Sequence, residues 1–218
     1  MPSRLRPTAP FAADAILVGD PGRALLLAQE LLEQPKMSNH ARGLWGYSGR
    51  TPSGAELTIQ ATGMGGPSAA LVLNDLAKLG VKRVVRVGTC TSIGGAALGE
   101  LLLVERALAA GGSAGAFGLD LGAATQPDPQ LLAALRPELD GEEVTIASMD
   151  TMATSSEAPR EAIAVDMQTV AVFACARQLE IAAAAILIVN EADGKLLDDD
   201  ALAATASEAG QAARQGLI

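Results

Sequence analysis

Aromatic residues are scarce in this chain: they make up 2% of its 218 residues, whereas hydrophobic residues of all kinds make up 49%. A core with so few rings must be filled by Ala, Val, Leu and Ile. Such a core favours a parallel or mixed sheet covered by Ala- and Leu-rich helices. The length fits a single domain, residues 1–218, with a core of useful size.

Cysteine is also rare: only Cys90 and Cys175 occur, and they do not have CxxC spacing. Isolated thiols of this kind indicate a reduced, cytoplasmic protein rather than a disulfide framework. No apolar run is long enough to span a bilayer without a polar break, and the amino terminus lacks the apolar block of a signal peptide. We therefore expect a cytoplasmic protein that has no membrane partner.

Basic residues are outnumbered, with 16 Lys and Arg against 25 Asp and Glu, for a net charge of −9. This balance argues against a nucleic-acid partner, although a small anion can still bind where a few arginines converge. The single histidine, His40, is expected in a loop, and the run Asp198 to Asp200 is typical of a helix start rather than a metal site. We expect neither a metal nor an organic cofactor.

Strand and helix patterns alternate along the chain without repeats, which predicts one α/β sandwich. The predicted strands are 15–19, 44–49, 56–61, 81–88, 101–110, 143–148, 163–167 and 183–189. The predicted helices are 23–33, 67–80, 129–135, 168–179 and 202–215, and the Gly- and Ala-rich residues 111–122 are predicted to be irregular.

The most informative residue is Arg86, which lies in the apolar run Val84-Val85-Arg86-Val87-Gly88. A guanidinium in an apolar strand is costly to desolvate unless it forms an ion pair with an anion. Its partner is either an internal Asp or Glu or a bound anion. Arg86 lies near the carboxyl end of its predicted strand, where open α/β sheets usually bind ligands, and Thr89 follows in a turn.

Two further loops of small residues follow predicted strands and precede predicted helices. The first, Gly19-Asp20-Pro21-Gly22-Arg23, offers backbone amides at a helix start and an arginine in its first turn. The second is Gly63-Met64-Gly65-Gly66-Pro67-Ser68. Each loop alone could serve only as a turn. Three loops at strand ends, two of them with arginines, favour a shared anion site.

Four sequence blocks resemble the signatures of the nucleoside phosphorylase-I family: GDPGR at 19–23, TGMGGPS at 62–68, RVGTC at 86–90 and VDMQ at 165–168. This family includes hexameric purine nucleoside phosphorylases and uridine phosphorylases. The resemblance implies a three-layer α/β/α subunit with a central mixed, mostly parallel sheet, assembled as homodimers or homohexamers. It also implies that inorganic phosphate cleaves a nucleoside to a free base and a sugar 1-phosphate.

The resemblance assigns roles to individual residues. The phosphate ligands that it implies are Gly19, Arg23, Arg86 and Thr89, with Arg42 lent to the phosphate of a neighbouring subunit. The ribose and base would meet Met64, Met152, Met167, Gln168 and Glu191. Arg86 and Glu191 are the candidate catalytic residues. Glu191 would protonate the leaving base, and Asp193 is the alternative acid. Glu191 could instead be a solvated carboxylate at the end of a strand, without a catalytic role.

The chain also departs from the family pattern. Gln168 stands where the family usually has a Glu that binds both ribose hydroxyls, so that contact would carry no charge. Purine enzymes of the family have an arginine that supports the acid, and at the matching region this chain has Ala204. The family's amino-terminal His, which contacts the ribose of the neighbouring subunit, is absent. Met152 stands where the family usually has an aromatic residue that stacks on the base. The chain also lacks, in this stretch, the Gln-x-Arg pair with which uridine phosphorylases recognise uracil. This absence favours a purine over a pyrimidine as the base of the substrate. The alternatives are a nucleosidase that uses water and a non-catalytic nucleoside or phosphate binder.

Overall fold

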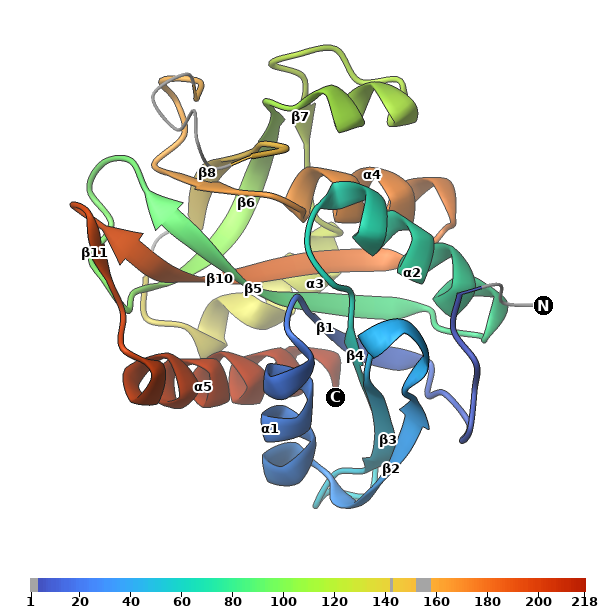
Figure 1. Cartoon of the computed structure of the whole chain (residues 1–218). Helices are drawn as coiled ribbons and strands as arrows, with labels where there is room; N and C mark the ends of the chain where they lie inside the picture. Colours follow the sequence, from blue (N-terminus) through green and yellow to red (C-terminus); the bar gives the residue numbers. More distant parts are fainter. Residues whose placement is uncertain (1–3, 142, 152–157) are drawn as a thin grey trace.

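A computed structural model describes residues 4–141, 143–151 and 158–218 and contains one mixed sheet flanked by helices (Figure 1). The described strands are β1 Asp14–Val18, β2 Glu33–Asn39, β3 Gly46–Arg50, β4 Glu56–Ala61, β5 Arg83–Ser92, β6 Leu101–Ala109, β7 Ala124–Thr125, β8 Glu143–Ser148, β9 Ala164–Asp166, β10 Ala182–Ala192 and β11 Lys195–Leu196. The described helices are α1 Pro21–Leu31, α2 Gly66–Lys78, α3 Pro129–Leu135, α4 Thr169–Gln178 and α5 Asp199–Leu217, with 3-10 turns η1 Ala41–Gly43, η2 Gly112–Phe117 and η3 Arg136–Glu138.

The sheet closes on itself at one end. Strand β1 lies between β4 and β5 and is parallel to both. Beyond it, β5 pairs with β10 in parallel, and β10, β6, β8 and β9 then lead back to β5. The ring brings the carboxyl ends of β5 and β10 close to β9, three elements that are far apart in sequence.

Helices cover both faces of the sheet, which confirms the three-layer α/β/α architecture. Helices α2 and α4 pack on one face, and α1, α3 and α5 pack on the other (Figure 1). The cores between the layers consist mainly of Ala, Val, Leu and Ile, as the scarcity of rings predicts. Within the described part of the chain, no helix is both long and apolar enough to cross a membrane.

Aspartates fix where three of the helices begin. Asp20, Asp128 and Asp198 accept hydrogen bonds from backbone N–H groups of the first turns of α1, α3 and α5. Each cap satisfies a donor that the helix leaves unpaired. Asp198 therefore starts a helix, as predicted. The cap at Asp20 also fixes the position of Arg23, whose backbone N–H is the donor at 2.8 Å.

Strand β2 is the main element that the sequence pattern misses. Its sequence, EQPKMSN, carries charges and a proline and has no apolar alternation. Proline is tolerated because β2 pairs only with β3, at the edge of the sheet. The predicted helix 23–33 accordingly ends earlier, at Leu31. The stretch 111–122 also contains more order than predicted, since η2 forms within it.

Candidate functional site

A cavity of about 280 Å³ opens at the carboxyl ends of β1, β5 and β10. Its wall includes four of the predicted phosphate ligands, Gly19, Arg23, Arg86 and Thr89. It also includes four of the predicted sugar and base ligands, Met64, Met167, Gln168 and Glu191. Residues from all four sequence blocks and from β10 thus meet at one place, where the strand order of the sheet predicts a ligand.

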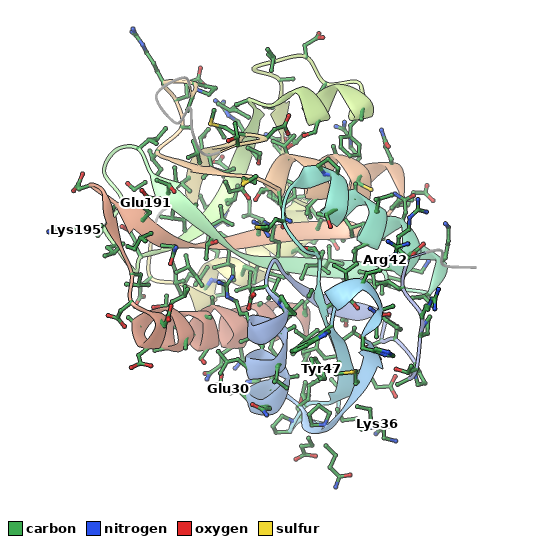
Figure 2. The ribbon with its side chains drawn as sticks, viewed as in Figure 1. Glu30, Lys36, Arg42, Tyr47, Glu191 and Lys195 are labelled. Atoms are coloured by element: carbon green, nitrogen blue, oxygen red, sulfur yellow. The ribbon has the colours of Figure 1, made fainter. Side chains whose placement is uncertain are left out.

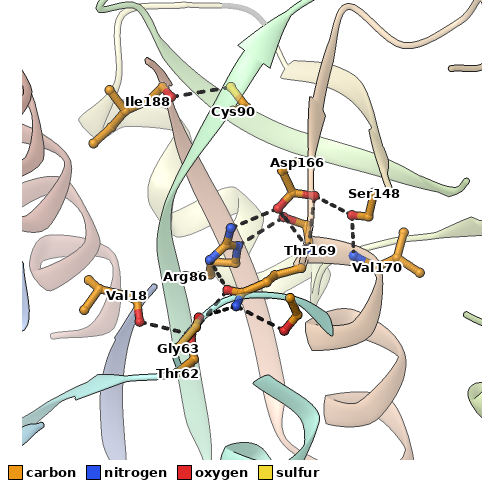
Figure 3. Close-up of polar contacts among 12 residues, drawn as sticks. Val18, Thr62, Gly63, Arg86, Cys90, Ser148, Asp166, Thr169, Val170 and Ile188 are labelled. Atoms are coloured by element: carbon orange, nitrogen blue, oxygen red, sulfur yellow. Dashed lines mark hydrogen bonds and ion pairs between the residues drawn. The ribbon is translucent and has the colours of Figure 1, made fainter. Parts of the chain in front are cut away.

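Arg86 is buried at 4% exposure and is paired with an internal acid. Its Nη2 donates to Asp166 Oδ2 at 2.9 Å, its Nη1 to Gln168 Oε1 at 2.7 Å, and its Nε to Thr169 Oγ1 at 3.3 Å (Figure 3). Of the two partners that the sequence left open for Arg86, the structure shows the internal acid and not a bound anion alone. Burial of the guanidinium requires a fixed negative charge, and Asp166 supplies it.

Asp166 is itself held rigidly. Its carboxylate accepts hydrogen bonds from the Ser148 hydroxyl and from the backbone N–H and hydroxyl of Thr169 (Figure 3). These hydrogen bonds satisfy the carboxylate oxygens of Asp166 and so offset part of the cost of burying the ion pair. Arg86 has five N–H donors, of which this network engages three. Two N–H groups remain that could meet a ligand in the cavity.

Arg23 is the second cation of the cavity wall. Among the described residues, its guanidinium forms no ion pair within 4.0 Å. Burial lowers the pKa of Arg23 from its ordinary value, Asp20 opposes that effect, and the nearby charge of Arg86 lowers the pKa further. Asp166 balances one of the two guanidiniums. The other creates a positive field at the amino end of α1, which favours an anion.

Gln168, at 3% exposure, forms its polar contacts within the protein. Its Oε1 accepts from Arg86 and lies 3.2 Å from Thr62 Oγ1, and its Nε2 donates to the carbonyls of Gly63 and Gly65 (Figure 3). Both amide hydrogens are therefore engaged by the loop that precedes α2. The predicted contact with ribose would require one of these bonds to be exchanged.

Replacing Gln168 with Glu is expected to destabilise the protein by about 1–3 kcal/mol. A carboxylate has no hydrogen to donate, so it would face the Gly63 and Gly65 carbonyls that the amide now satisfies. Thermal or urea unfolding measures the change, and Gln178→Glu at the exposed end of α4 is the control, with an expected change within about 0.5 kcal/mol. Equal stability of Gln168→Glu and the wild type would contradict this role.

Glu191 lies at the carboxyl end of β10 (Figure 2). It lines two cavities. One is the cavity of Arg23 and Arg86, and the other, of about 800 Å³, lies beside it. Thr91 Oγ1 donates to Glu191 Oε2 at 3.2 Å, which leaves Oε1 for a ligand. Asp193 lines only the second of these cavities, so of the two predicted acids only Glu191 lies in the wall of the cavity of Arg23 and Arg86.

Two predicted residues, Arg42 and Met64, lie apart from the cavity wall or at its edge. Arg42 is exposed in η1 and does not line the cavity of its own chain (Figure 2). Met64 lines the cavity but is 87% exposed, so it lies at the mouth. Met152 falls outside the described residues.

Cys90 also lines the cavity, but burial raises the pKa of its thiol well above the ordinary range. Burial likewise raises the pKa of Cys175 to about 11, where the side chain packs in the core between α2 and α4. A thiol with a raised pKa is a poor nucleophile at neutral pH. Neither cysteine is therefore a candidate catalytic residue.

Several residues of the site carry no obvious signal in the sequence. Asp166, Ser148 and Thr169 form the network that holds Arg86, yet each is an ordinary polar residue at the end of an element. Asp166 is the acid of β9, which pairs with β5, so a correct prediction of that strand pairing would have identified it. Asn190 was also missed, and its position in an apolar strand next to Glu191 was the available clue.

The chain was compared with known proteins. A family model described as "Phosphorylase superfamily" matches residues 14–217. "Purine nucleoside phosphorylase DeoD-type" of Oceanobacillus iheyensis is 47% identical over 83 residues, which is 37% of this chain and 35% of that protein. The protein of the same name from Clostridium novyi is 45% identical over 84 residues, 38% of this chain and 36% of that protein. The chain thus aligns with about a third of the length of these relatives.

Solved structures resemble the whole chain. The crystal structure of uridine phosphorylase from Vibrio fischeri matches with a TM-score of 0.81 at 22% sequence identity. The match covers 95% of this chain and 92% of that one. At this identity the likeness establishes the fold, and it does not separate a purine from a pyrimidine substrate.

Proposed function

The chain belongs to the phosphorylase superfamily, and on that premise we propose that it catalyses the reversible phosphorolysis of a nucleoside, with a purine as the base. The observation that carries the proposal is the guanidinium of Arg23 at the cavity wall, which forms no ion pair within 4.0 Å among the described residues. Asp166 pairs with Arg86, the other guanidinium of the wall. A phosphate ion beside Arg23 would supply the counter-charge that this side chain lacks.

In the proposed reaction, phosphate binds among Gly19, Arg23, Thr89 and the free N–H groups of Arg86. A phosphate oxygen forms a bond to the anomeric carbon while the bond from that carbon to the base breaks. The bonding electrons go to the base, and Glu191 supplies the proton that neutralises it. Met64 and Met167 would contact the sugar, and no metal or organic cofactor is needed.

The assembly and location are also part of the proposal. We propose a homodimer or homohexamer in the cytoplasm, in which Arg42 of one copy reaches the phosphate of the next. Its exposure in η1 and its absence from its own cavity support this role. Nucleic acids and membranes are not expected partners, because the chain is acidic and its described helices are too short or too polar to span a bilayer.

The direct test is release of free base from a panel of nucleosides, measured with and without inorganic phosphate. Release that depends on phosphate supports the proposal. Release that is independent of phosphate would assign a nucleosidase instead, and binding of nucleoside without release would assign a binding protein. The neutralisation of Arg86 by Asp166 makes this comparison necessary, since it leaves Arg23 as the main charge available to phosphate.

Replacing Glu191 with Gln is expected to lower kcat for a purine nucleoside by about 10²- to 10⁴-fold. The amide keeps the size of the side chain but cannot deliver an acidic proton to the leaving base. Asp193→Asn is the matched control and should retain activity within about threefold, because Asp193 does not line the phosphate cavity. If the two variants lose activity equally, or Asp193→Asn loses more, Glu191 is not the acid.

A further inference from the structure

A bulge in β10 places Glu191 beside Thr91. Val189 pairs with Cys90 and Glu191 pairs with the next residue of β5, Thr91, so Asn190 has no partner on that strand. In a regular strand successive side chains point to opposite faces, and a shift of one residue in register exchanges those faces. Without the bulge, Asn190 would be in register with Thr91. The bulge therefore brings the candidate acid next to a hydroxyl, and bulges recur beside active sites, where they redirect a side chain.

Thr91 and Glu191 also lie at the border between two cavities. Among the described residues, they are the two that line both the cavity of Arg23 and Arg86 and the neighbouring cavity of about 800 Å³. Both are half-buried. An acid at this border can meet a ligand from either side, so the direction of its carboxylate depends on whichever protein group binds it.

The hydroxyl of Thr91 is that group. Thr91 Oγ1 donates to Glu191 Oε2 at 3.2 Å. Within the described part of the chain, the Glu191 carboxylate has no other hydrogen bond and no ion pair within 4.0 Å. The distance is longer than in most O–H···O bonds, as catalytic hydrogen bonds often are before a ligand binds. Because Thr91 engages Oε2, the proton of a protonated Glu191 belongs on Oε1.

The hydrogen bond from Thr91 gains strength when Glu191 gives up its proton. In the proposed reaction the O–H bond at Oε1 breaks, the proton goes to a ring nitrogen of the leaving base, and Glu191 becomes a carboxylate. A hydrogen bond to an ionised carboxylate is roughly twice as strong as one between neutral groups. An interaction that strengthens along the reaction lowers the barrier without tightening the binding of the substrate, so its effect falls on kcat.

We propose that Thr91 is a positioning residue, which keeps the acidic proton of Glu191 on Oε1 and stabilises the carboxylate that forms as the base leaves. This inference rests on the proposed function, because it uses Glu191 as the acid. Thr91→Val keeps the shape of the side chain and removes only the hydroxyl. We expect this variant to lower kcat by about 10-fold, with changes below about threefold in the KM for nucleoside and for phosphate.

The test is a double-mutant cycle on phosphate-dependent base release from adenosine, inosine and guanosine. It compares the wild type, Thr91→Val, Glu191→Gln and the variant that carries both changes. Because Thr91 acts through the proton of Glu191, we expect Thr91→Val to lower kcat by less than about twofold in the Glu191→Gln background. Thr91→Ser restores the hydroxyl and should keep kcat within about threefold of the wild type.

Thr205→Val is the matched control, since it removes a hydroxyl of α5 that donates to the carbonyl of Ala201. Its kcat should equal that of the wild type, and the melting temperature of each Thr91 variant should lie within about 4 °C of the wild type. Three results would overturn the inference and leave phosphorolysis standing: an unchanged kcat in Thr91→Val, no recovery in Thr91→Ser, or losses that multiply in the double variant. Absence of base release by the wild type from all three nucleosides would overturn the proposed function, and the inference with it.

Discussion

Replacing Arg23 with Gln is expected to lower kcat/KM for phosphate by about 100-fold, with most of the loss in the KM for phosphate. Arg23 lies in the first turn of α1, where backbone N–H groups and the helix dipole already favour an anion. Burial and the charge of Arg86 lower the pKa of Arg23. Bound phosphate would relieve this repulsion and gain charge-assisted hydrogen bonds, and both gains vanish with glutamine.

The fold should survive this change, since the Arg23 side chain forms no ion pair among the described residues. The cap of α1 is also kept, because Asp20 accepts a hydrogen bond from the backbone N–H of residue 23 and not from its side chain. Initial rates at varied phosphate measure the effect, with the melting temperature as a check on folding. Arg50→Gln, at an exposed arginine of β3, is the matched control and should leave the phosphate kinetics unchanged. An unchanged KM for phosphate in Arg23→Gln would remove Arg23 from the phosphate site.

Replacing Asp166 with Ala is expected to destabilise the protein by about 3–5 kcal/mol. The substitution leaves the buried Arg86 guanidinium without its counter-charge and removes the acceptor for Ser148 and Thr169. For a chain of this size the expected fall in melting temperature is roughly 6–20 °C. Calorimetry or denaturant unfolding measures the loss.

Asp14→Ala is the matched control for this experiment. Asp14 pairs with Arg83 at 2.6 Å, but the arginine side chain is 44% exposed, so solvent screens the pair and its loss should cost about 1 kcal/mol or less. A second variant, Arg86→Met in the Asp166→Ala background, should recover part of the lost stability, because it removes the unpaired charge. Similar losses in Asp166→Ala and Asp14→Ala would show that the buried pair is not the main support of the site.

Much of the fold follows from local patterns in the sequence. The strand at Glu143–Ser148 has the same bounds in the structure as in the prediction, and the layers follow from the alternation of strands and helices. Strand β2 was missed because edge strands need no apolar alternation. The extension of β5 to Ser92 was also missed, because it depends on pairing with β9 and β10, which no local pattern encodes.

The members of the site were predictable, but their bonding was not. Gly19, Arg23, Arg86 and Thr89 meet at one cavity, as expected from loops at strand ends. The sequence could not decide the partner of Arg86, because it is the closed ring of strands that places Asp166, 80 residues further along the chain, beside β5. The hydrogen bonds of Gln168 to the loop of residues 63–65 depend on the same closure of the ring. The bulge at Asn190 depends on the register between β10 and β5.

The central claim is that an oxyanion beside Arg23, rather than water, attacks the sugar. The most direct measurement is the ³¹P NMR spectrum of a reaction that contains the protein, a purine nucleoside and inorganic phosphate. We predict that a sugar 1-phosphate signal grows as the phosphate signal falls, in step with release of the base. Free base that accumulates while the phosphate signal stays constant would contradict the claim.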